Sequence, residues 1–201
     1  MAQVEFPLKV LLKFVETLST ELGHETATAV IKKSGLPKEW AHDDNFTALN
    51  NEQAAMAYSR LQSALRAYYG RGARGILLRI GAKLWEQLLN DASFGIKAQA
   101  AVIRGLPKFL RRKQALELLR KILSVNKNDI TLHTLDLDLL FVDSTSATTL
   151  NQTDDTPVCF VTFGLIRECL YWASGEEHDI EERACKAMGA RQCEFKITIG
   201  G

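Results

Sequence analysis

The sequence shows no marked excess of charge of either sign, because 25 lysine and arginine residues stand against 24 aspartate and glutamate residues, for a formal net charge of +1. Proteins that bind the phosphates of nucleic acids usually carry a basic surplus. No apolar run approaches the roughly 20 residues that a membrane-spanning helix needs. We therefore expect neither a nucleic-acid partner nor a transmembrane segment.

Cysteine is scarce, with four in 201 residues, and none of them forms a C-x-x-C pair. The N-terminus, with Glu5 and no small-residue cleavage site, does not read as a signal peptide. Unpaired thiols are typical of a reducing compartment, so we expect a cytoplasmic protein. The length and the hydrophobic fraction of 46% suffice for an ample core, and we expect residues 1–201 to form a single domain.

Motifs of common enzymes are also lacking, since neither a Walker loop nor a Ser-His-Asp arrangement is visible. Residues 70–75 do match G-x-G-x-x-G. The dinucleotide-binding form of that motif requires a strand before the glycines, whereas residues 51–69 have the periodicity of a helix. We therefore predict a turn between two helices, with Arg71 and Arg74 exposed.

The first 125 residues have mainly helical periodicity. We predict helices over five ranges, in most of which apolar residues recur at spacings of three and four: 6–22, 24–33, 51–69, 72–89 and 106–123. For residues 94–104 the pattern leaves helix and strand open, and the polar stretch 38–50 is predicted to be a loop, lid or linker. The helix at 106–123 is basic, a pattern typical of a solvated face and, less often, of binding to an anionic membrane or an acidic partner.

After residue 126 the pattern changes to the alternation of strands. We predict one strand or a hairpin over residues 129–142, a helix over 158–173 and a terminal hairpin around Gly189. The predicted fold class is α/β of the α+β type. A helical half, residues 1–125, packs on an antiparallel sheet of about four strands in residues 126–201, and one helix crosses between the two halves of the sheet.

The last part of the chain holds all four cysteines, and three of them suit a metal site. Cys185 and Cys193 flank a glycine-containing turn, so a hairpin would bring their thiols together. Cys159 begins a helix, whose dipole favours the thiolate form. Strict strand alternation would place Glu182 and Cys185 on opposite faces, so both can bind one metal only if the strand is bulged or ends there.

Cys159, Glu182, Cys185 and Cys193 together form a closed set of four ligands that suits zinc. Cys169 follows ten residues after Cys159, about 15 Å along an unbroken helix, and is therefore assigned to packing. Spacing alone leaves a second interpretation open. In that interpretation the three cysteines are reduced, buried and act as small hydrophobic residues, while Glu182 is solvated.

The motifs of this region are Pro157-Val158-Cys159, Glu182-x-x-Cys185, Met188-Gly189 and Cys193-Glu194-Phe195. Together they resemble the 4-vinyl-reductase domain family, which includes sensory domains of aromatic-hydrocarbon-responsive regulators and a protein linked to bacteriochlorophyll synthesis. In the phenol-sensing members, an E-x-x-C-x7-C motif and an upstream cysteine bind structural zinc. The resemblance covers about a quarter of the chain closely and implies zinc at the same four positions here.

The resemblance also implies a function: binding of a small hydrophobic or aromatic ligand, with a tetrapyrrole precursor of chlorophyll as one candidate, in a carrier or accessory role in pigment synthesis. One alternative is a vinyl-group reductase acting on a chlorophyllide, although no nucleotide site is visible to supply hydride. Another is an assembly scaffold without a ligand. We favour binding over catalysis. The family's similarity to trafficking-complex subunits implies a homodimer formed through the helical face.

A ligand pocket between the sheet and the helices is predicted from hydrophobicity and position, and no catalytic residue is predicted. The residues expected to line the pocket are Trp85, Phe94, Phe109, His133, Phe163 and Trp172. A histidine on a strand is more often hydrogen-bonded within the fold than engaged with a ligand. The histidine and tryptophan with which the phenol sensors hold the ligand hydroxyl have no motif match in this sequence.

Overall fold

The structure is a computed structural model that describes residues 3–37 and 45–199. Six α-helices precede the sheet in the described part of the chain: α1 (Leu8–Leu22), α2 (His24–Lys33), α3 (Asn51–Tyr69), α4 (Ala73–Asn90), α5 (Phe94–Gly105) and α6 (Lys108–Leu123). The C-terminal part contains the strands β1 (Ile130–Leu135), β2 (Asp138–Asp143), β3 (Asp179–Ala184) and β4 (Cys193–Thr198), and the helix α7 (Phe160–Ser174). This arrangement confirms the predicted α+β class.

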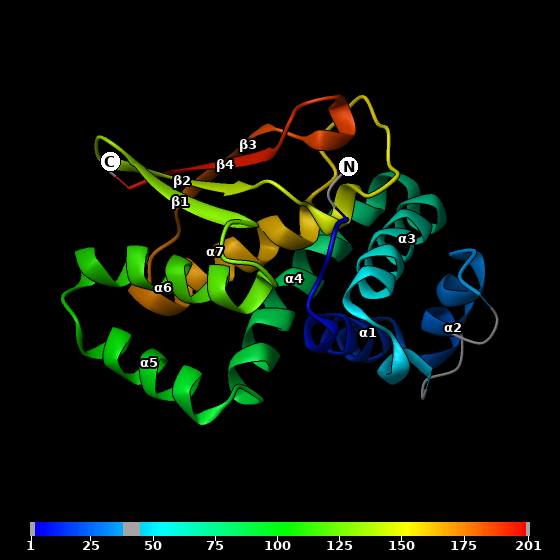
Figure 1. Cartoon of the computed structure of the whole chain (residues 1–201), viewed down its shortest axis with the longest axis horizontal. Helices are drawn as coiled ribbons and strands as arrows, with labels where there is room; N and C mark the ends of the chain where they lie inside the picture. Colours follow the sequence, from blue (N-terminus) through cyan, green and yellow to red (C-terminus); the bar gives the residue numbers. More distant parts are fainter. Residues whose placement is uncertain (1–2, 38–44, 200–201) are drawn as a thin grey trace.

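The four strands form one antiparallel sheet in the order β1-β2-β4-β3. A tight turn joins β1 to β2, with Asp136 in the left-handed region at φ 53°. The connection from β2 to β3 contains α7, which runs beneath the sheet and carries the chain to its other edge (Figure 1). Of the two options left open for residues 129–142, the structure has the hairpin, and it confirms the helix that crosses between the two halves of the sheet.

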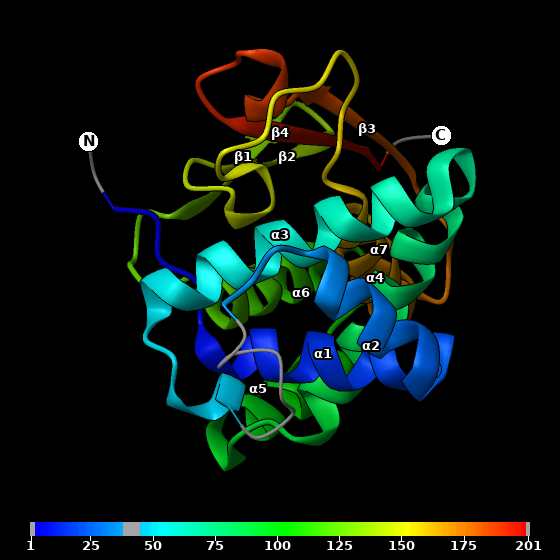
Figure 2. The ribbon, with the colours of Figure 1, turned by 90° about the vertical axis from the view of Figure 1, so that its right-hand side faces the viewer.

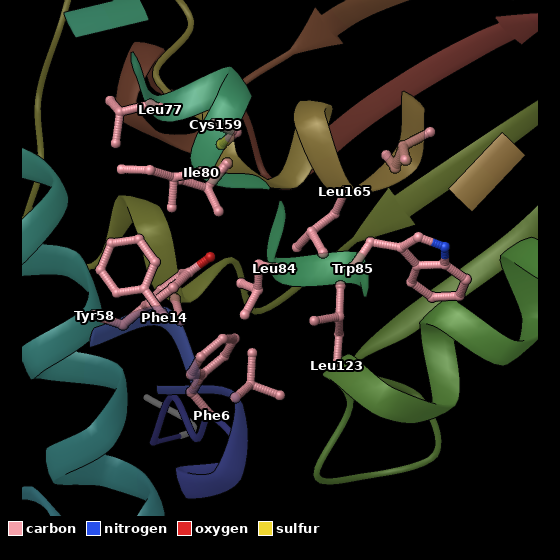
Figure 3. Packing of buried hydrophobic residues seen from close by; sticks show 14 of the residues in the cluster. Phe6, Phe14, Tyr58, Leu77, Ile80, Leu84, Trp85, Leu123, Cys159 and Leu165 are labelled. Carbon is pink, nitrogen blue, oxygen red and sulfur yellow. The ribbon is translucent and has the colours of Figure 1, made fainter. Parts of the chain in front are cut away.

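The helices lie on one side of the sheet, with α6 and α7 next to it and α1 farther away (Figures 1 and 2). Side chains from several helices meet in the core, where Phe14 of α1, Tyr58 of α3, Leu84 of α4 and Leu165 of α7 lie near one another (Figure 3). The Tyr58 ring stacks on that of Phe6, with centroids 4.2 Å apart. Side chains therefore fill this part of the space between the helical layers.

The structure describes all or part of three stretches that the sequence left open or predicted to be loops or turns. Residues 94–105 form helix α5 rather than a strand. Of the loop predicted at 38–50, residues 38–44 lie outside the described residues, and Asn45–Ala48 forms a short 3-10 helix. The G-x-G-x-x-G stretch joins α3 to α4 through a 3-10 turn, Gly70–Gly72, with Arg71 and Arg74 exposed as predicted. No helix in the described ranges is long and apolar enough to cross a bilayer.

Candidate metal centre and the adjoining groove

Three segments bring the sequence-predicted metal ligands together. Cys159 is the N-cap of α7, Glu182 lies in β3, Cys185 directly follows β3, and Cys193 is the first residue of β4. All three cysteines are buried and free of disulfides. The start of the crossing helix therefore meets the terminal hairpin at these four side chains.

The distances within this cluster suit a tetrahedral ion. The Sγ atom of Cys159 lies 3.9 Å from that of Cys185 and 3.6 Å from that of Cys193. One ligand atom from each of the four residues, Glu182 included, lies within 4.8 Å of all the others. A tetrahedral zinc with Zn–S bonds of about 2.3 Å separates its sulfur ligands by about 3.8 Å. The spacing of the sulfurs thus fits one zinc ion at their centre.

A β-bulge explains how Glu182 and Cys185 reach the same place. The pairing of β3 with β4 shifts register between Glu182 and Ala184, and β3 ends at Ala184. The chain then turns back, because the N–H groups of Met188 and Ala190 both donate to the carbonyl oxygen of Cys185, at 3.0 and 3.3 Å. Gly189 completes the turn at φ 89°, in the left-handed region that favours glycine. The structure therefore contains the bulge and the strand end that the ligand set requires.

The electrostatics of the cluster favour a cation. One carboxylate oxygen of Glu182, Oε1, is buried without a hydrogen-bond partner. Burial raises the pKa of the Glu182 carboxyl to about 8, and the nearby Cys185 thiolate adds to the rise. Hydrogen bonds to Cys185 and Cys193 raise the pKa of the Cys159 thiol, whereas hydrogen bonds from Cys159 and Cys193 lower that of Cys185. Burial among these neighbours disfavours the charged forms of Glu182 and Cys159, and a divalent ion would stabilise the charged forms of all four ligands.

Two residues that the sequence did not single out support the cysteines. Ser146 Oγ lies 3.2 Å from Cys193 Sγ, and the backbone N–H of Lys186 donates to the same sulfur at 3.3 Å. The carboxylate of Asp143 accepts the N–H of Ser146 at 2.6 Å and so fixes the loop that carries this hydroxyl. Asp143 pairs with Cys193 across β2 and β4. The polar sequence from 143 to 146 signals a turn, but only the strand pairing places it beside the metal cluster.

A half-open groove adjoins the cluster between α4, α7 and β3. Its volume is about 510 Å³, and its apolar lining is Leu78, Pro157, Phe160, Phe163 and Ile180. Arg74, Thr156, Glu181 and Glu182 complete the lining. The guanidinium of Arg74 lies over the ring of Phe160, 5.9 Å from its centroid. Glu182 therefore belongs both to the metal cluster and to the wall of the groove.

The six residues predicted to line a ligand pocket do not come together. Phe163 lines the groove. Trp85 is buried and packs edge to face on Trp172, with centroids 5.6 Å apart. His133 is exposed on β1, with its Nε2 2.9 Å from the hydroxyl of Thr131.

The remaining two candidates, Phe94 and Phe109, are 88% and 70% exposed. Phe94 lies on the side of α5 opposite the buried Ile103, whereas Phe109 lies in the first turn of α6, before the buried part of that helix begins at Ala115. Sequence reasoning also missed Leu78 and Ile180 of the groove. No local signal distinguishes these two from ordinary core residues.

Comparisons with known proteins find one matching family model and several similar folds. Residues 143–199, which include the whole metal cluster, match the family model of the V4R domain and confirm the resemblance to the 4-vinyl-reductase family. The fold is similar to that of the phenol-responsive sensory domain of the transcription activator PoxR, solved with phenol, at 16% identity and a TM-score of 0.50, over 71% of this chain and 73% of that chain.

The fold is also similar to that of two H-NOX proteins. An H-NOX protein from K. algicida is 11% identical with a TM-score of 0.60, over 96% of this chain and 96% of that chain. One from S. oneidensis is 11% identical with a TM-score of 0.58, over 96% of this chain and 99% of that chain. Likeness at such identities concerns the fold alone. No curated protein sequence matches this chain.

Proposed function

We propose, from the V4R domain that residues 143–199 form, that this chain is a zinc-stabilised domain that binds a small hydrophobic or aromatic molecule. The ligand site is the groove between α4, α7 and β3. The observation that carries the proposal is the double position of Glu182, which lies in the metal cluster and lines the groove. A metal ion at the cluster would hold one wall of the binding site in place.

The metal in this proposal is structural. Cys159, Cys185 and Cys193 would supply three sulfur ligands and Glu182 one oxygen, which closes a tetrahedral shell and leaves no position for a substrate. The ion would tie the N-terminus of α7 to the hairpin of β3 and β4. Because the ion would join segments far apart in the sequence, metal binding would contribute to the stability of the fold.

The groove suits a ligand with a flat apolar body. Its volume of about 510 Å³ lies within the usual range of small-molecule sites. Phe160 and Phe163 offer aromatic faces, and Arg74 offers a cation at the edge for a hydroxyl or carboxylate of the ligand. One solved neighbour in fold holds phenol, and heme distortion is described for the H-NOX family. We propose a phenol-sized aromatic and a tetrapyrrole precursor as the two ligand classes to test.

The decisive experiment is native mass spectrometry of the full chain purified from its own host without chelator. We expect about one zinc per chain and an additional hydrophobic molecule that is lost on denaturation. Phe163→Ala should reduce the bound fraction at least tenfold, while Phe109→Ala, a matched change at an exposed phenylalanine outside the groove, should not. Zinc-bound protein without any such molecule, and without affinity for phenol or a water-soluble porphyrin, would contradict the proposed binding.

We also propose that the protein is cytoplasmic and forms a homodimer, as expected from the sequence. Four free cysteines agree with a reducing compartment. The dimer can be measured by sedimentation velocity of the purified chain.

An assembly scaffold without a ligand is the second candidate, and one observation favours it. The enclosed space lined by Phe6, Tyr58, Ile130 and Thr148, in the interior between the helices and the sheet, measures only about 10 Å³. Such a space holds no ligand larger than a water molecule. The mass spectrometry above separates the two functions, because a scaffold would show zinc without an additional molecule.

A further inference from the structure

The helices α5 and α6 carry a group of exposed apolar side chains that the proposed function does not use. Its members are Phe94, Val102, Phe109 and Leu110, with exposed fractions of 88%, 66%, 70% and 43%. We call them the α5–α6 face. Phe94 and Val102 lie in α5, and Phe109 and Leu110 lie in the first turn of α6, just after the short connection between the two helices. Exposed apolar side chains of this size on neighbouring segments mark interaction sites.

The pattern of α5 explains why its apolar side chains face solvent. Phe94, Ala98 and Val102 follow one another at spacings of four and therefore form one stripe of the helix. The opposite side is turned inward, with Ile103 buried and Ile96 and Ala100 partly buried against the core. Helix α5 lies at the end of the molecule opposite the sheet, where it packs on α6 and on the end of α4 (Figures 1 and 2). The stripe is thus left open by the fold itself.

The charge around this face has one sign. Residues 94–116 contain six basic residues, Lys97, Arg104, Lys108, Arg111, Arg112 and Lys113, and no acidic residue. The acidic group that pairs with this segment is Glu176, which accepts hydrogen bonds from Lys108 and Arg112. Arg112 is mostly buried at this pair, and Arg104 lies over the ring of Trp172, but both Arg104 and three lysines of the segment are exposed. The balanced net charge of the whole chain therefore conceals a local basic surface.

We propose that the α5–α6 face binds the surface of an anionic membrane. Exposed aromatic and aliphatic side chains next to lysine and arginine are the arrangement with which helices lie in a lipid interface, where the apolar atoms enter the acyl boundary and the cations meet the headgroups. This proposal does not depend on the metal or on the groove ligand.

A second copy of the chain fits this surface less well. Pairing the face with itself would bring the exposed cations of two copies near one another, and like charges repel. A fluid anionic surface carries the complementary charge instead. Self-association through this face would appear as a dimer in sedimentation velocity.

The test is co-sedimentation of the full chain with vesicles. One set contains phosphatidylcholine alone, and the other contains in addition roughly 30% phosphatidylserine, a typical anionic composition. We expect binding to the anionic vesicles, at least tenfold weaker binding to the neutral ones, and a decrease as the salt concentration rises above about 0.15 M. The double variant Val102→Glu/Phe109→Glu should reduce binding to the anionic vesicles at least tenfold.

The matched control is Tyr68→Glu, which places the same charge on an exposed aromatic position, 47% exposed, at the far end of α3. This control should bind the anionic vesicles like the unchanged protein. Circular dichroism melts of both variants show whether they fold. No binding to anionic vesicles, or equal binding to both vesicle types, would overturn the proposal. A double variant that turns a dimer into a monomer in sedimentation velocity, without vesicle binding by the unchanged chain, would assign the face to a second copy.

Discussion

Gly81 of α4 and Gly164 of α7 lie directly against each other where the two helices cross. A Cβ atom on Gly81 would lie 3.0 Å from the Cα of Gly164, and one on Gly164 would lie 3.1 Å from the Cα of Gly81. Either atom would also clash with a backbone carbonyl oxygen, of Val161 or of Leu78. Helices α4 and α7 also form two walls of the groove, so this close crossing holds those two walls together.

Gly164→Ala is therefore expected to destabilise the protein by about 2–4 kcal/mol, because the added methyl group meets backbone atoms that cannot rotate away. The matched control is Gly75→Ala in α4, where nothing lies within 4 Å of the added atom. That control should be neutral or stabilising by about 0.5–1 kcal/mol, since alanine favours a helix over glycine. Urea unfolding measures both free energies. Equal stability of the two variants would mean that the helices do not cross so closely.

Cys185→Ser is expected to lower the zinc content from about one per chain to a small fraction. It should also lower the unfolding temperature by about 10 °C or more, because loss of a structural metal removes several kcal/mol from a domain of this size. Cys169→Ala is the control, since Cys169 is equally buried but lies outside the cluster. It should keep its zinc and cost only about 1 kcal/mol of packing. Elemental analysis and calorimetry give the two readings, and loss of zinc from the control would assign the metal to other residues.

The contribution of Glu182 to the stability of the metal-free protein is expected to fall as the pH rises from about 5 to 8. The pKa of Glu182 is raised from 4.5 to about 8, mainly by burial. Between these values the carboxyl keeps its proton in the folded chain and loses it in the unfolded chain, so the part of the free energy of unfolding that this group supplies decreases with pH. Glu182→Gln removes this titration. Urea unfolding in chelator measures the free energy of unfolding of both proteins. The value for the unchanged chain minus that for the variant should decrease as the pH rises, because the unchanged chain loses its proton-linked stability. A free energy for the unchanged chain that rises relative to that of the variant would contradict the raised pKa.

Removal of the metal is expected to weaken ligand binding at least tenfold, because Glu182 lies in both sites and loses its fixed position without the ion. Titration calorimetry with phenol and with a water-soluble porphyrin, before and after chelation, measures the change. Glu181→Gln is a control at a groove residue outside the metal cluster. This variant should retain zinc, and its affinity for the ligand should still fall on chelation. Ligand affinity that is unchanged by chelation would separate the groove from the metal site.

Local sequence determined those features that depend on neighbours along the chain. The glycine-containing turn between Cys185 and Cys193 and the helix start at Cys159 are readable from spacing, because hairpins and helix ends are local structures. The structure brings these cysteines together with Glu182 as that reading implied. The local sequence also indicated the turn between two helices at Gly70 and allowed the hairpin of β1 and β2. Segment 94–104 stayed open because its short apolar pattern fits either element.

Only the tertiary structure decided where the groove lies and which side chains line it. Leu78, Phe163 and Ile180 come from three elements that meet through the crossing of α4 and α7, and nothing in their own neighbourhoods distinguishes them from core residues. Phe94 and Phe109 look like pocket residues in sequence, yet Phe94 lies on the side of α5 that faces solvent and Phe109 lies ahead of the buried part of α6. Hydrophobicity shows that a side chain tends to be buried. Which partner buries it, or whether any does, depends on contacts between segments far apart in the chain.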